Sequence, residues 1–542
     1  MRTLFVALLL FLSLSALAQK LNPQFEAQLN AAYKPGEPGA TALVAKGGKP
    51  IYRGAVGMAD LENNVALRPE HVFEIGSITK QFTAVSILML MEQGKLRLED
   101  PLTKFIPDYP KAEGITIHHL LTHTSGIKSY TSMEAWAKRW REDLTPLQMI
   151  DIFKNEPMDF APGEKWSYNN SAYFILGYII EKTSGVSYAE FLEKNIFVPL
   201  GMKNTSYGSQ SKIIKNRAQG YQRRDGYVRA EYLSLTQPYA AGSIMSTVDD
   251  LLLWQLAINR NQLIRKETQQ LAYTPVKLNN GEVHDYGYGW GLGAVNGSPT
   301  REHSGGIFGY STNEIYLPNE DVYVAVFSNC DCSSPTDVSA RLAGIAIGKP
   351  YLEPVAKVQL NPAYAQSLAG TYDFADGSTR IISAEGNQLF SQRGGSGRFK
   401  IFPQDKTTFS FETGLTSLRF VVADGKVKEV RFMDRSGKEI TGQLSTKVAT
   451  PRTVVAVKPE ILGRYVGTYE LMPNFNMVVT LEGGRLMSEV SGQPKAELFG
   501  MSDTRFFLKN AEAVVEFVAN AAGTFDLVVY DSGQKMAGKR KG

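Results

Sequence analysis

The sequence contains very few cysteines and histidines. Only two cysteines occur among 542 residues, Cys330 and Cys332, and Asp331 separates them. Two cysteines cannot form a disulfide framework, a bridge this short would be strained, and a zinc site would need more ligands nearby. We therefore interpret the pair as structural or incidental, ahead of a redox or metal-binding role. The six histidines form no His-Glu-x-x-His pair, so we predict neither a metal site nor any other cofactor.

A strong net charge and a long apolar run are also missing. Lysine and arginine total 58 against 54 acidic residues, which gives a formal net charge of +4 and no basis for a nucleic-acid partner. No apolar stretch is long enough to span a bilayer, so no integral membrane segment is expected.

The first residues have the pattern of a signal peptide. Arg2 precedes the apolar run Leu4 to Leu14, and Ala16-Leu17-Ala18 supplies small residues at a cleavage site. We expect residues 1–18 to be removed after Ala18 and the mature protein to be exported, either to a periplasm or out of the cell. No cysteine follows the cleavage site, which argues against a lipid anchor.

The length is too great for one hydrophobic core, so several domains are expected. Residues 19–348 mix strand and helix patterns. Two hairpins are predicted, around Gly47-Gly48 near the start and around Pro318-Asn319 near the end. The helices predicted between them cover residues 77–93, 171–183 and 247–258. Strands at both ends with helices between them predict an α+β domain, an antiparallel sheet covered by helices.

The remainder, after a linker at 349–354, is a duplicated β-rich segment. Gly370-Thr371-Tyr372 matches Gly467-Thr468-Tyr469 at an offset of 97, and the same offset relates three pairs of phenylalanines: Phe402 and Phe499, Phe409 and Phe506, Phe420 and Phe517. We predict two small barrel-like repeats, at 355–447 and 455–542. A spacer, oligomer-forming or gating role is favoured over ligand storage, and whether the chain forms a homo-oligomer stays open.

Ser77 and Lys80 lie three residues apart at the start of a predicted helix, after Gly76. Positions i and i+3 share one face of a helix, so the lysine amine can lie beside the serine hydroxyl. A desolvated lysine with a lowered pKa can take the proton of such a hydroxyl and make it a nucleophile. The rival Ser-His-Asp chemistry lacks its G-x-S-x-G elbow here.

Three motifs occur in order: Ser77-Ile78-Thr79-Lys80, Tyr168-Asn169-Asn170 and His303-Ser304-Gly305-Gly306. Together with the segments 120–126 and 162–168, they resemble the S-x-x-K, Y-x-N and H-x-G motifs of the penicillin-recognising serine hydrolases. That group includes class C β-lactamases, D-alanyl-D-alanine carboxypeptidases, D-aminopeptidases and esterases. The resemblance covers about residues 25 to 347, and the two repeats that follow are similar to the D-aminopeptidase layout.

The resemblance implies a role for each motif residue. Ser77 becomes acylated, Lys80 accepts or relays its proton, and Tyr168 acts as partner base if neighbouring cations lower its pKa. The backbone NH groups of Ser77 and Gly306 bind the carbonyl oxygen, while Asn170 bonds the substrate amide. His303 hydrogen-bonds into the region between Ser77 and Tyr168 or faces the substrate, next to Ser304 and Gly305. His123 is expected to be a structural hydrogen-bonding residue.

The histidine at position 303 replaces a lysine found in many β-lactamases. A histidine of ordinary pKa is mostly neutral at pH 7, so substrates that depend on a free carboxylate, including β-lactams, should bind weakly. We therefore expect an exported serine hydrolase acting on D-amino-acid-containing peptides or small esters. The alternatives are a penicillin-binding sensor or cell-wall binding protein that acylates with little turnover, a β-lactamase proper, and an interaction protein that uses the repeats.

Overall fold

A computed structural model describes residues 21–393, 398–445, 454–472, 475–490, 495–508, 513–520, 523–531 and 534–541. The predicted signal peptide lies outside these residues. The chain divides into two compact units, of which the first ends at Tyr351 and the second begins at Leu352. Each unit is described by itself.

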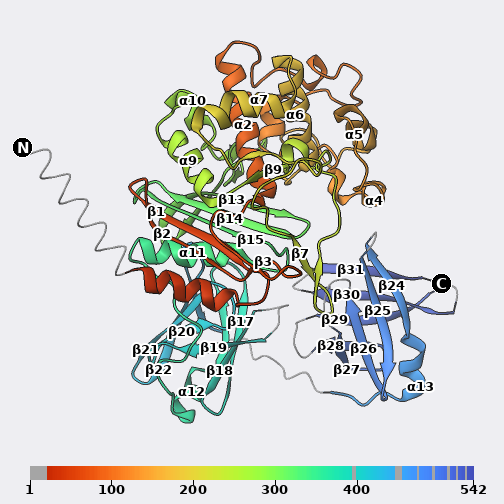
Figure 1. The fold of residues 1–542 in the computed structure, drawn as a ribbon. Coiled ribbons are helices and arrows are strands. Elements are labelled where there is room, and N and C mark those ends of the chain that lie inside the picture. The colour runs from red at the N-terminus through yellow and green to blue at the C-terminus, as the bar shows by residue number, and fades with distance from the viewer. Residues whose placement is uncertain are drawn as a thin grey trace, which may run out of the picture. The chain divides into compact units, whose positions relative to one another are not determined.

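The first unit is built on a six-stranded antiparallel sheet of order β12-β13-β14-β15-β1-β2 (Figure 1). Both predicted hairpins belong to it: β1 pairs with β2, and β14 pairs with β15. The two hairpins are joined because β1 also pairs with β15. Nearly every residue of β14 and β15 is buried, as expected for strands covered on both faces. The strands are β1 (Ala40–Lys46), β2 (Lys49–Val56), β12 (Gly291–Val295), β13 (Ser298–Ile307), β14 (Tyr310–Leu317) and β15 (Val322–Ser328).

Helices cover both faces of this sheet, which confirms the predicted α+β class. Helix α11 (Pro335–Ala346) lies on one face, and the larger group with α2 (Thr79–Glu92), α6 (Asn170–Ser184) and α9 (Val248–Asn259) lies on the other (Figure 1). Helix α6 ends at Gly185, which adopts a left-handed φ of 79° that suits glycine at this position. The three predicted helices are therefore present, with ends shifted by one or two residues.

The first unit contains shorter elements as well, and residues 21–32 are helical. The further helices are α3 (Ile117–Leu121), α4 (Glu134–Ala137), α5 (Pro146–Phe153), α7 (Tyr188–Leu192), α8 (Val198–Leu200) and α10 (Lys266–Leu271). The further strands are β3 (Met58–Asp60), β4 (Val65–Ala66), β5 (Phe73–Glu74), β6 (Ser206–Tyr207), β7 (Tyr221–Arg223), β8 (Tyr227–Arg229), β9 (Ile244–Ser246), β10 (Val276–Lys277) and β11 (Val283–His284).

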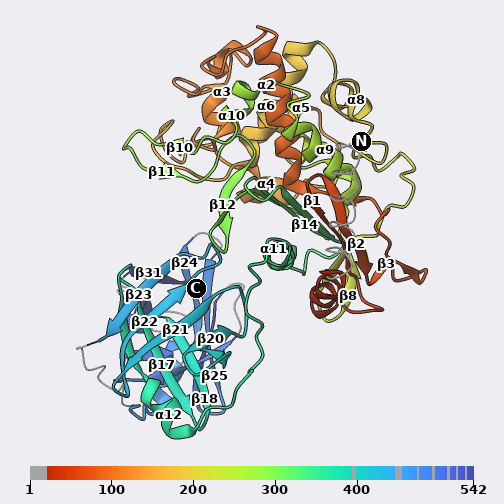
Figure 2. The same cartoon turned by 90° about the vertical axis from the view of Figure 1, so that its left-hand side faces the viewer.

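The second unit holds two closed eight-stranded barrels, as the duplication predicts (Figure 2). Their registers are equivalent, because Tyr372 faces Arg380 in the first barrel and Tyr469 faces Met477 in the second. The first barrel comprises β16 (Gly370–Phe374), β17 (Thr379–Glu385), β18 (Gln388–Arg393), β19 (Arg398–Pro403), β20 (Thr408–Phe411), β21 (Ser417–Ala423), β22 (Lys426–Met433) and β23 (Glu439–Leu444), preceded by α12 (Pro362–Leu368). The second comprises β24 (Gly467–Met472), β25 (Phe475–Glu482), β26 (Arg485–Val490), β27 (Ala496–Gly500), β28 (Arg505–Leu508), β29 (Val514–Ala519), β30 (Phe525–Asp531) and β31 (Gln534–Lys541), preceded by α13 (Pro459–Leu462).

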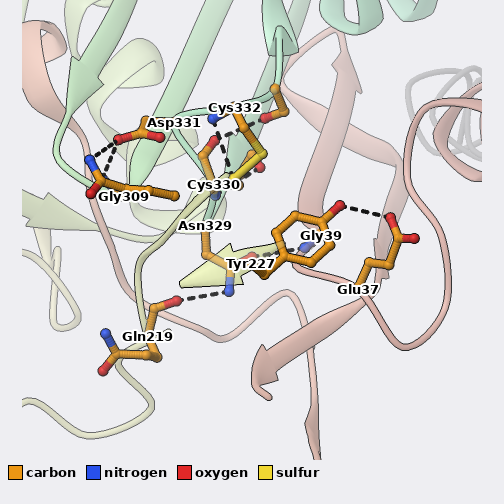
Figure 3. Close-up of a disulfide and its surroundings, with 12 residues drawn as sticks. Glu37, Gly39, Gln219, Tyr227, Gly309, Asn329, Cys330, Asp331 and Cys332 are labelled. Carbon is orange, nitrogen blue, oxygen red and sulfur yellow. Dashed lines mark hydrogen bonds between the residues drawn. A yellow bond between two sulfur atoms is a disulfide. The ribbon is translucent and has the colours of Figure 1, made fainter. Parts of the chain in front are cut away.

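Cys330 and Cys332 form a local disulfide just after β15 (Figure 3). The residues beside it connect several strands: Asn329 accepts a hydrogen bond from the backbone NH of Gly39 at 2.8 Å, and Asp331 accepts one from that of Gly309 at 3.0 Å. The bridge therefore lies in a hydrogen-bonded junction between sheet and loops, which fits a structural role. None of the helices in the described ranges is long and apolar enough to cross a membrane.

Candidate active site

Ser77 lies on a short 3₁₀ turn, Gly76–Ile78, that connects β5 to helix α2. The turn packs against the edge of β13. Gly76 has a φ of 51°, and a Cβ atom on it would approach the backbone nitrogen of Gly306 to 2.8 Å, so only glycine fits this position without strain. This close approach brings the backbone of Gly306 beside the turn that carries Ser77.

Lys80 is completely buried on the first turn of α2. Its Nζ lies 3.0 Å from Ser77 Oγ, 2.8 Å from Asn170 Oδ1 and 2.9 Å from the backbone oxygen of Ala241. Burial lowers the pKa of Lys80 well below its ordinary value. A neutral amine has two hydrogens and one lone pair. The two fixed acceptors, on Asn170 and Ala241, can take both hydrogens, which leaves the lone pair for the hydroxyl of Ser77.

Tyr168 contacts both Ser77 and Lys80. The centre of its ring lies 4.8 Å from Lys80 Nζ, and its hydroxyl hydrogen-bonds with Ser77. Although 36% of the residue is exposed, desolvation raises the pKa of Tyr168, and the bond to Ser77 offsets only part of that rise. The condition for Tyr168 to act as a base at rest, a pKa lowered by neighbouring cations, is therefore not met. The nearest cationic group is Lys80, whose own charge is disfavoured by burial, so the phenol rests in its neutral form.

Asn170 contacts the catalytic amine, and its predicted bond to a substrate amide stays a prediction. Its amide oxygen accepts a hydrogen bond from Lys80, and its Nδ2 donates to Thr131 Oγ1 at 3.2 Å. The side chain therefore positions the amine of Lys80 through its oxygen, and the second N–H of its Nδ2 is the group that could donate to a substrate. Asn169 caps α6 by accepting the NH of Ala172 at 2.9 Å, which fixes where Asn170 begins the helix.

The third motif lies on β13, along the part of that strand that borders the nucleophile turn. Gly305 faces inward, where a Cβ atom would collide with the carbonyl oxygen of Ile75, whereas nothing lies within 4 Å of a Cβ atom on Gly306. Ser304 and Gly306 are exposed, on the opposite side of the strand. The backbone nitrogen of Gly306 thus lies next to the turn that carries Ser77, in the region where the two donors for a carbonyl oxygen are expected.

His303 is buried and both of its ring nitrogens have partners. Nε2 lies 2.9 Å from the hydroxyl of Tyr286, and Nδ1 lies 2.6 Å from the backbone oxygen of Ser304. Burial is the largest cause that lowers the pKa of His303 to about 3, and Lys80, whenever it carries a charge, opposes a second cation beside it. The imidazole is therefore neutral, with Nδ1–H donating to Ser304 and Nε2 accepting from Tyr286. These bonds take the place of the predicted hydrogen bond toward Ser77 and Tyr168.

Several residues of the site have no signal in the motifs. Tyr286 lies in the loop after β11 and would be found only through the unusual run Tyr286-Gly287-Tyr288-Gly289-Trp290. Tyr173 lies under the amine, with its ring centre 5.5 Å from Lys80 Nζ. The oxygen of Ala241 is a backbone atom, which sequence patterns cannot identify.

His123 supports the site from below, as predicted for a structural residue. It is fully buried, and its Nδ1 accepts the backbone NH of Asn169 at 3.0 Å. Its ring centre lies 4.5 Å from that of Tyr168. Within the described part of the chain, no group of three or more histidine, cysteine or acidic residues is placed to hold a metal ion.

Comparison with protein families gives two matches. Residues 23–348 match the Beta-lactamase family, and residues 451–540 match a domain of unknown function, DUF3471. The first match covers the whole sheet-and-helix domain and all three motifs, while the second covers the second barrel.

Individual relatives extend the match into the repeats. The chain is 31% identical over 428 residues to penicillin-binding protein 4* of Bacillus subtilis, covering 74% of this chain and 94% of the relative. It is 25% identical over 488 residues to a D-aminopeptidase of Gluconobacter oxydans, covering 87% and 88% of the two chains. Among solved structures, the octameric penicillin-binding protein homologue from Pyrococcus abyssi matches with a TM-score of 0.53 and 27% identity, over 75% of this chain and 96% of that one.

Proposed function

The chain belongs to the beta-lactamase family of serine hydrolases, and we propose that it forms an acyl-enzyme at Ser77 with amide or ester substrates. One observation carries this proposal: the buried amine of Lys80 lies 3.0 Å from Ser77 Oγ with its other two neighbours both fixed acceptors. The arrangement presents a lone pair to the serine proton, which an ordinary charged lysine could not do.

The residues account for a complete acylation step. As Ser77 Oγ bonds to the substrate carbonyl carbon, its proton passes to Lys80 Nζ. The carbonyl oxygen gains negative charge and is held by the backbone NH groups of Ser77 and Gly306. The tetrahedral intermediate then expels the amine or alcohol, which takes a proton from the neutral hydroxyl of Tyr168, and Tyr168 recovers one from the protonated Lys80.

Deacylation runs through the same groups in the reverse direction. Water loses a proton toward Tyr168 and Lys80 while its oxygen attacks the acyl carbon. The bond to Ser77 Oγ then breaks, and the serine oxygen recovers a proton from Lys80. A site that holds Lys80 neutral at rest is suited to both half-reactions.

The neutral His303 supports a particular class of substrate. With a pKa of about 3 it places no cation beside the cleft at neutral pH, so a free substrate carboxylate has no partner on this residue. Esters, amides and peptides with a free amino end do not need one. The relative named D-aminopeptidase points in the same direction. D-amino-acid-containing peptides and small esters are thus the proposed substrates, and a β-lactamase proper is disfavoured.

A second candidate is a penicillin-binding sensor that acylates with little turnover. The relative from Bacillus subtilis is named a penicillin-binding protein, and that name favours this alternative. Mass spectrometry separates the two candidates, because a sensor keeps the adduct on Ser77 for hours while an enzyme loses it between turnovers.

A substrate panel tests the proposed activity. D- and L-aminoacyl p-nitroanilides, p-nitrophenyl esters and a chromogenic cephalosporin are assayed with wild type, Ser77→Ala and Ser86→Ala. Ser86 lies on the same helix, fully buried, and donates to the backbone oxygen of Phe82, so Ser86→Ala controls for general damage to α2. We expect turnover of esters or D-aminoacyl amides that only Ser77→Ala abolishes. Faster turnover of the cephalosporin than of any ester or amide would contradict the substrate class.

Export is part of the proposal, because residues 1–18 have the composition of a cleaved signal peptide. Expressing the full chain in a bacterial host and sequencing the N-terminus of the periplasmic or secreted product tests it. The expected first residue is Gln19, and a cytoplasmic product that retains Met1 would contradict it.

A further inference from the structure

His123, which packs beside Tyr168, has an unusual backbone conformation. Its φ is 61°, in the left-handed region that few residues other than glycine adopt. The side chain is nevertheless fully buried. A conformation of this kind costs free energy and persists only where the surrounding contacts hold it, so the contacts of His123 indicate its role.

Two hydrogen bonds join His123 to the residues on either side of Tyr168. The backbone oxygen of His123 accepts the NH of Ser167 at 3.0 Å, and its Nδ1 accepts the NH of Asn169 at 3.0 Å. Residues 165–169 belong to no helix or strand, so no regular backbone pairing fixes this segment. The two bonds therefore hold the backbone on both sides of Tyr168.

The imidazole also packs against the aromatic rings around the phenol. The centre of the imidazole ring lies 4.5 Å from that of Tyr168, 4.9 Å from that of Tyr286 and 5.0 Å from that of Tyr173. The hydroxyl of Tyr168 in turn bonds with Ser77. His123 thus lies directly beside the group that has to stay within reach of the nucleophile.

The bond from Asn169 is the one polar contact of the ring within the described part of the chain. Nδ1 accepts this bond and so carries no proton, which places the proton of the neutral ring on Nε2. Nε2 is buried and has no hydrogen-bond partner. Burial is the largest cause that lowers the pKa of His123 well below its ordinary value, so the neutral ring that can accept from Asn169 persists at neutral pH.

We propose that His123 is a positioning residue for proton transfer: by holding the chain on both sides of Tyr168, it keeps the phenol hydroxyl where it can donate a proton to the leaving group. This inference rests on the proposed acyl-enzyme at Ser77, with Tyr168 as its general acid. It differs from a purely structural role, because loss of a general acid slows only the substrates whose leaving group needs a proton. The amine released from an anilide needs one, whereas p-nitrophenolate leaves without one.

The test measures the rate at which Ser77 is acylated in a single turnover by a p-nitroanilide and by a p-nitrophenyl ester of the same acyl group. His123→Gly suits the positive φ but removes the side-chain acceptor. His123→Asn also tolerates a positive φ, and its amide oxygen can accept the NH of Asn169. His119→Ala is the matched control, because Nδ1 of His119 likewise accepts a backbone NH, that of Thr116 at 3.2 Å, but does so at the start of α3.

We expect His123→Gly to be acylated by the anilide at least tenfold more slowly than wild type, and by the ester within threefold of wild type. His123→Asn and His119→Ala should keep the wild-type ratio of the two rates. In a Tyr168→Phe background, His123→Gly should cause no further loss with the anilide, since the hydroxyl that it positions is absent. An unchanged anilide-to-ester ratio in folded His123→Gly, or the same tenfold loss in the Tyr168→Phe background, would overturn the proposal.

Melting temperatures show which variants are folded. If His123→Gly fails to fold, His123→Asn decides: a wild-type ratio in this variant, which lacks the ring but keeps an acceptor, supports the bond to Asn169 as the positioning contact, and a loss of that ratio overturns it. No acylation of wild type by either substrate would overturn the proposed function and this inference with it. Normal acylation of wild type with an unchanged ratio in His123→Gly would overturn this inference alone.

Discussion

The buried neutral state of His303 predicts how the stability of the first unit depends on pH. In the unfolded chain the histidine has an ordinary pKa of 6.5, whereas in the folded protein the pKa is about 3. Between these values the unfolded state binds a proton that the folded state does not. The contribution of His303 is therefore fully favourable above pH 6.5 and is lost as the pH falls toward 3.

The magnitude follows from the two pKa values. At pH 7 the unfolded histidine is mostly neutral, and at pH 5 it is almost fully protonated, while folded His303 stays neutral throughout. Linkage then lowers the free energy of unfolding by about 2 kcal/mol between pH 7 and pH 5. Glu74 and Glu314 act in the opposite direction, because burial raises the pKa of each to about 7, so the wild-type profile alone cannot isolate the histidine.

The variant His303→Gln separates the contribution of His303 from those of Glu74 and Glu314. Urea unfolding is followed by tryptophan fluorescence at pH 7 and pH 5, and all five tryptophans lie between Trp136 and Trp290, so the signal reports the first unit alone. Wild type should lose about 2 kcal/mol more than the variant over this interval. His284→Gln is the control, because that side chain is 38% exposed and its replacement should keep the wild-type dependence. Identical pH dependences for wild type and His303→Gln would refute the buried neutral imidazole.

Three further predictions concern the catalytic groups. Gly305→Ala should destroy activity, because its Cβ has no space beside the turn that carries Ser77. Gly306→Ala should stay folded and active, because its Cβ would meet nothing within 4 Å. Circular dichroism would show whether each variant is folded, and ester hydrolysis would show whether it is active. Tyr168→Phe should lower kcat for anilides by about 10²- to 10⁴-fold, the usual contribution of general acid-base catalysis, and an unchanged kcat would exclude the phenol from proton transfer. Asn170→Ala should lower kcat more than it raises KM, since it frees the amine of Lys80; a change in KM alone would indicate a substrate-binding role.

The parts of the site that sequence could predict are those set by local geometry. The i, i+3 spacing of Ser77 and Lys80 predicts their contact, and the structure places the two atoms 3.0 Å apart. The lowered pKa of Lys80 was predicted from desolvation and is confirmed in direction. The other predictable features also have local signals. Turn residues predict the hairpins, apolar periodicity predicts the long helices, and the constant offset of 97 predicts the two barrels.

The other features depend on contacts between distant segments. The oxygen of Ala241 reaches Lys80 across 161 positions, and the hydroxyl of Tyr286 reaches His303 from a loop outside the motifs. Both contacts depend on how the helices pack on the sheet. The raised pKa of Tyr168 depends on the assembled fold in the same way, because burial of the phenol is its largest cause. Strand order, with β1 between β15 and β2, also needs the assembled fold.

The central claim is that the hydroxyl of Ser77 becomes covalently acylated with Lys80 as its base. Rapid acid quench of the purified protein with a slowly deacylating p-nitrophenyl ester, followed by peptide mass spectrometry, tests this claim most directly. We predict one acyl group per chain on the peptide that contains Ser77, and its absence in Ser77→Ala and in Lys80→Met. An acyl group on another residue, or undiminished acylation of Ser77 in Lys80→Met, would contradict it.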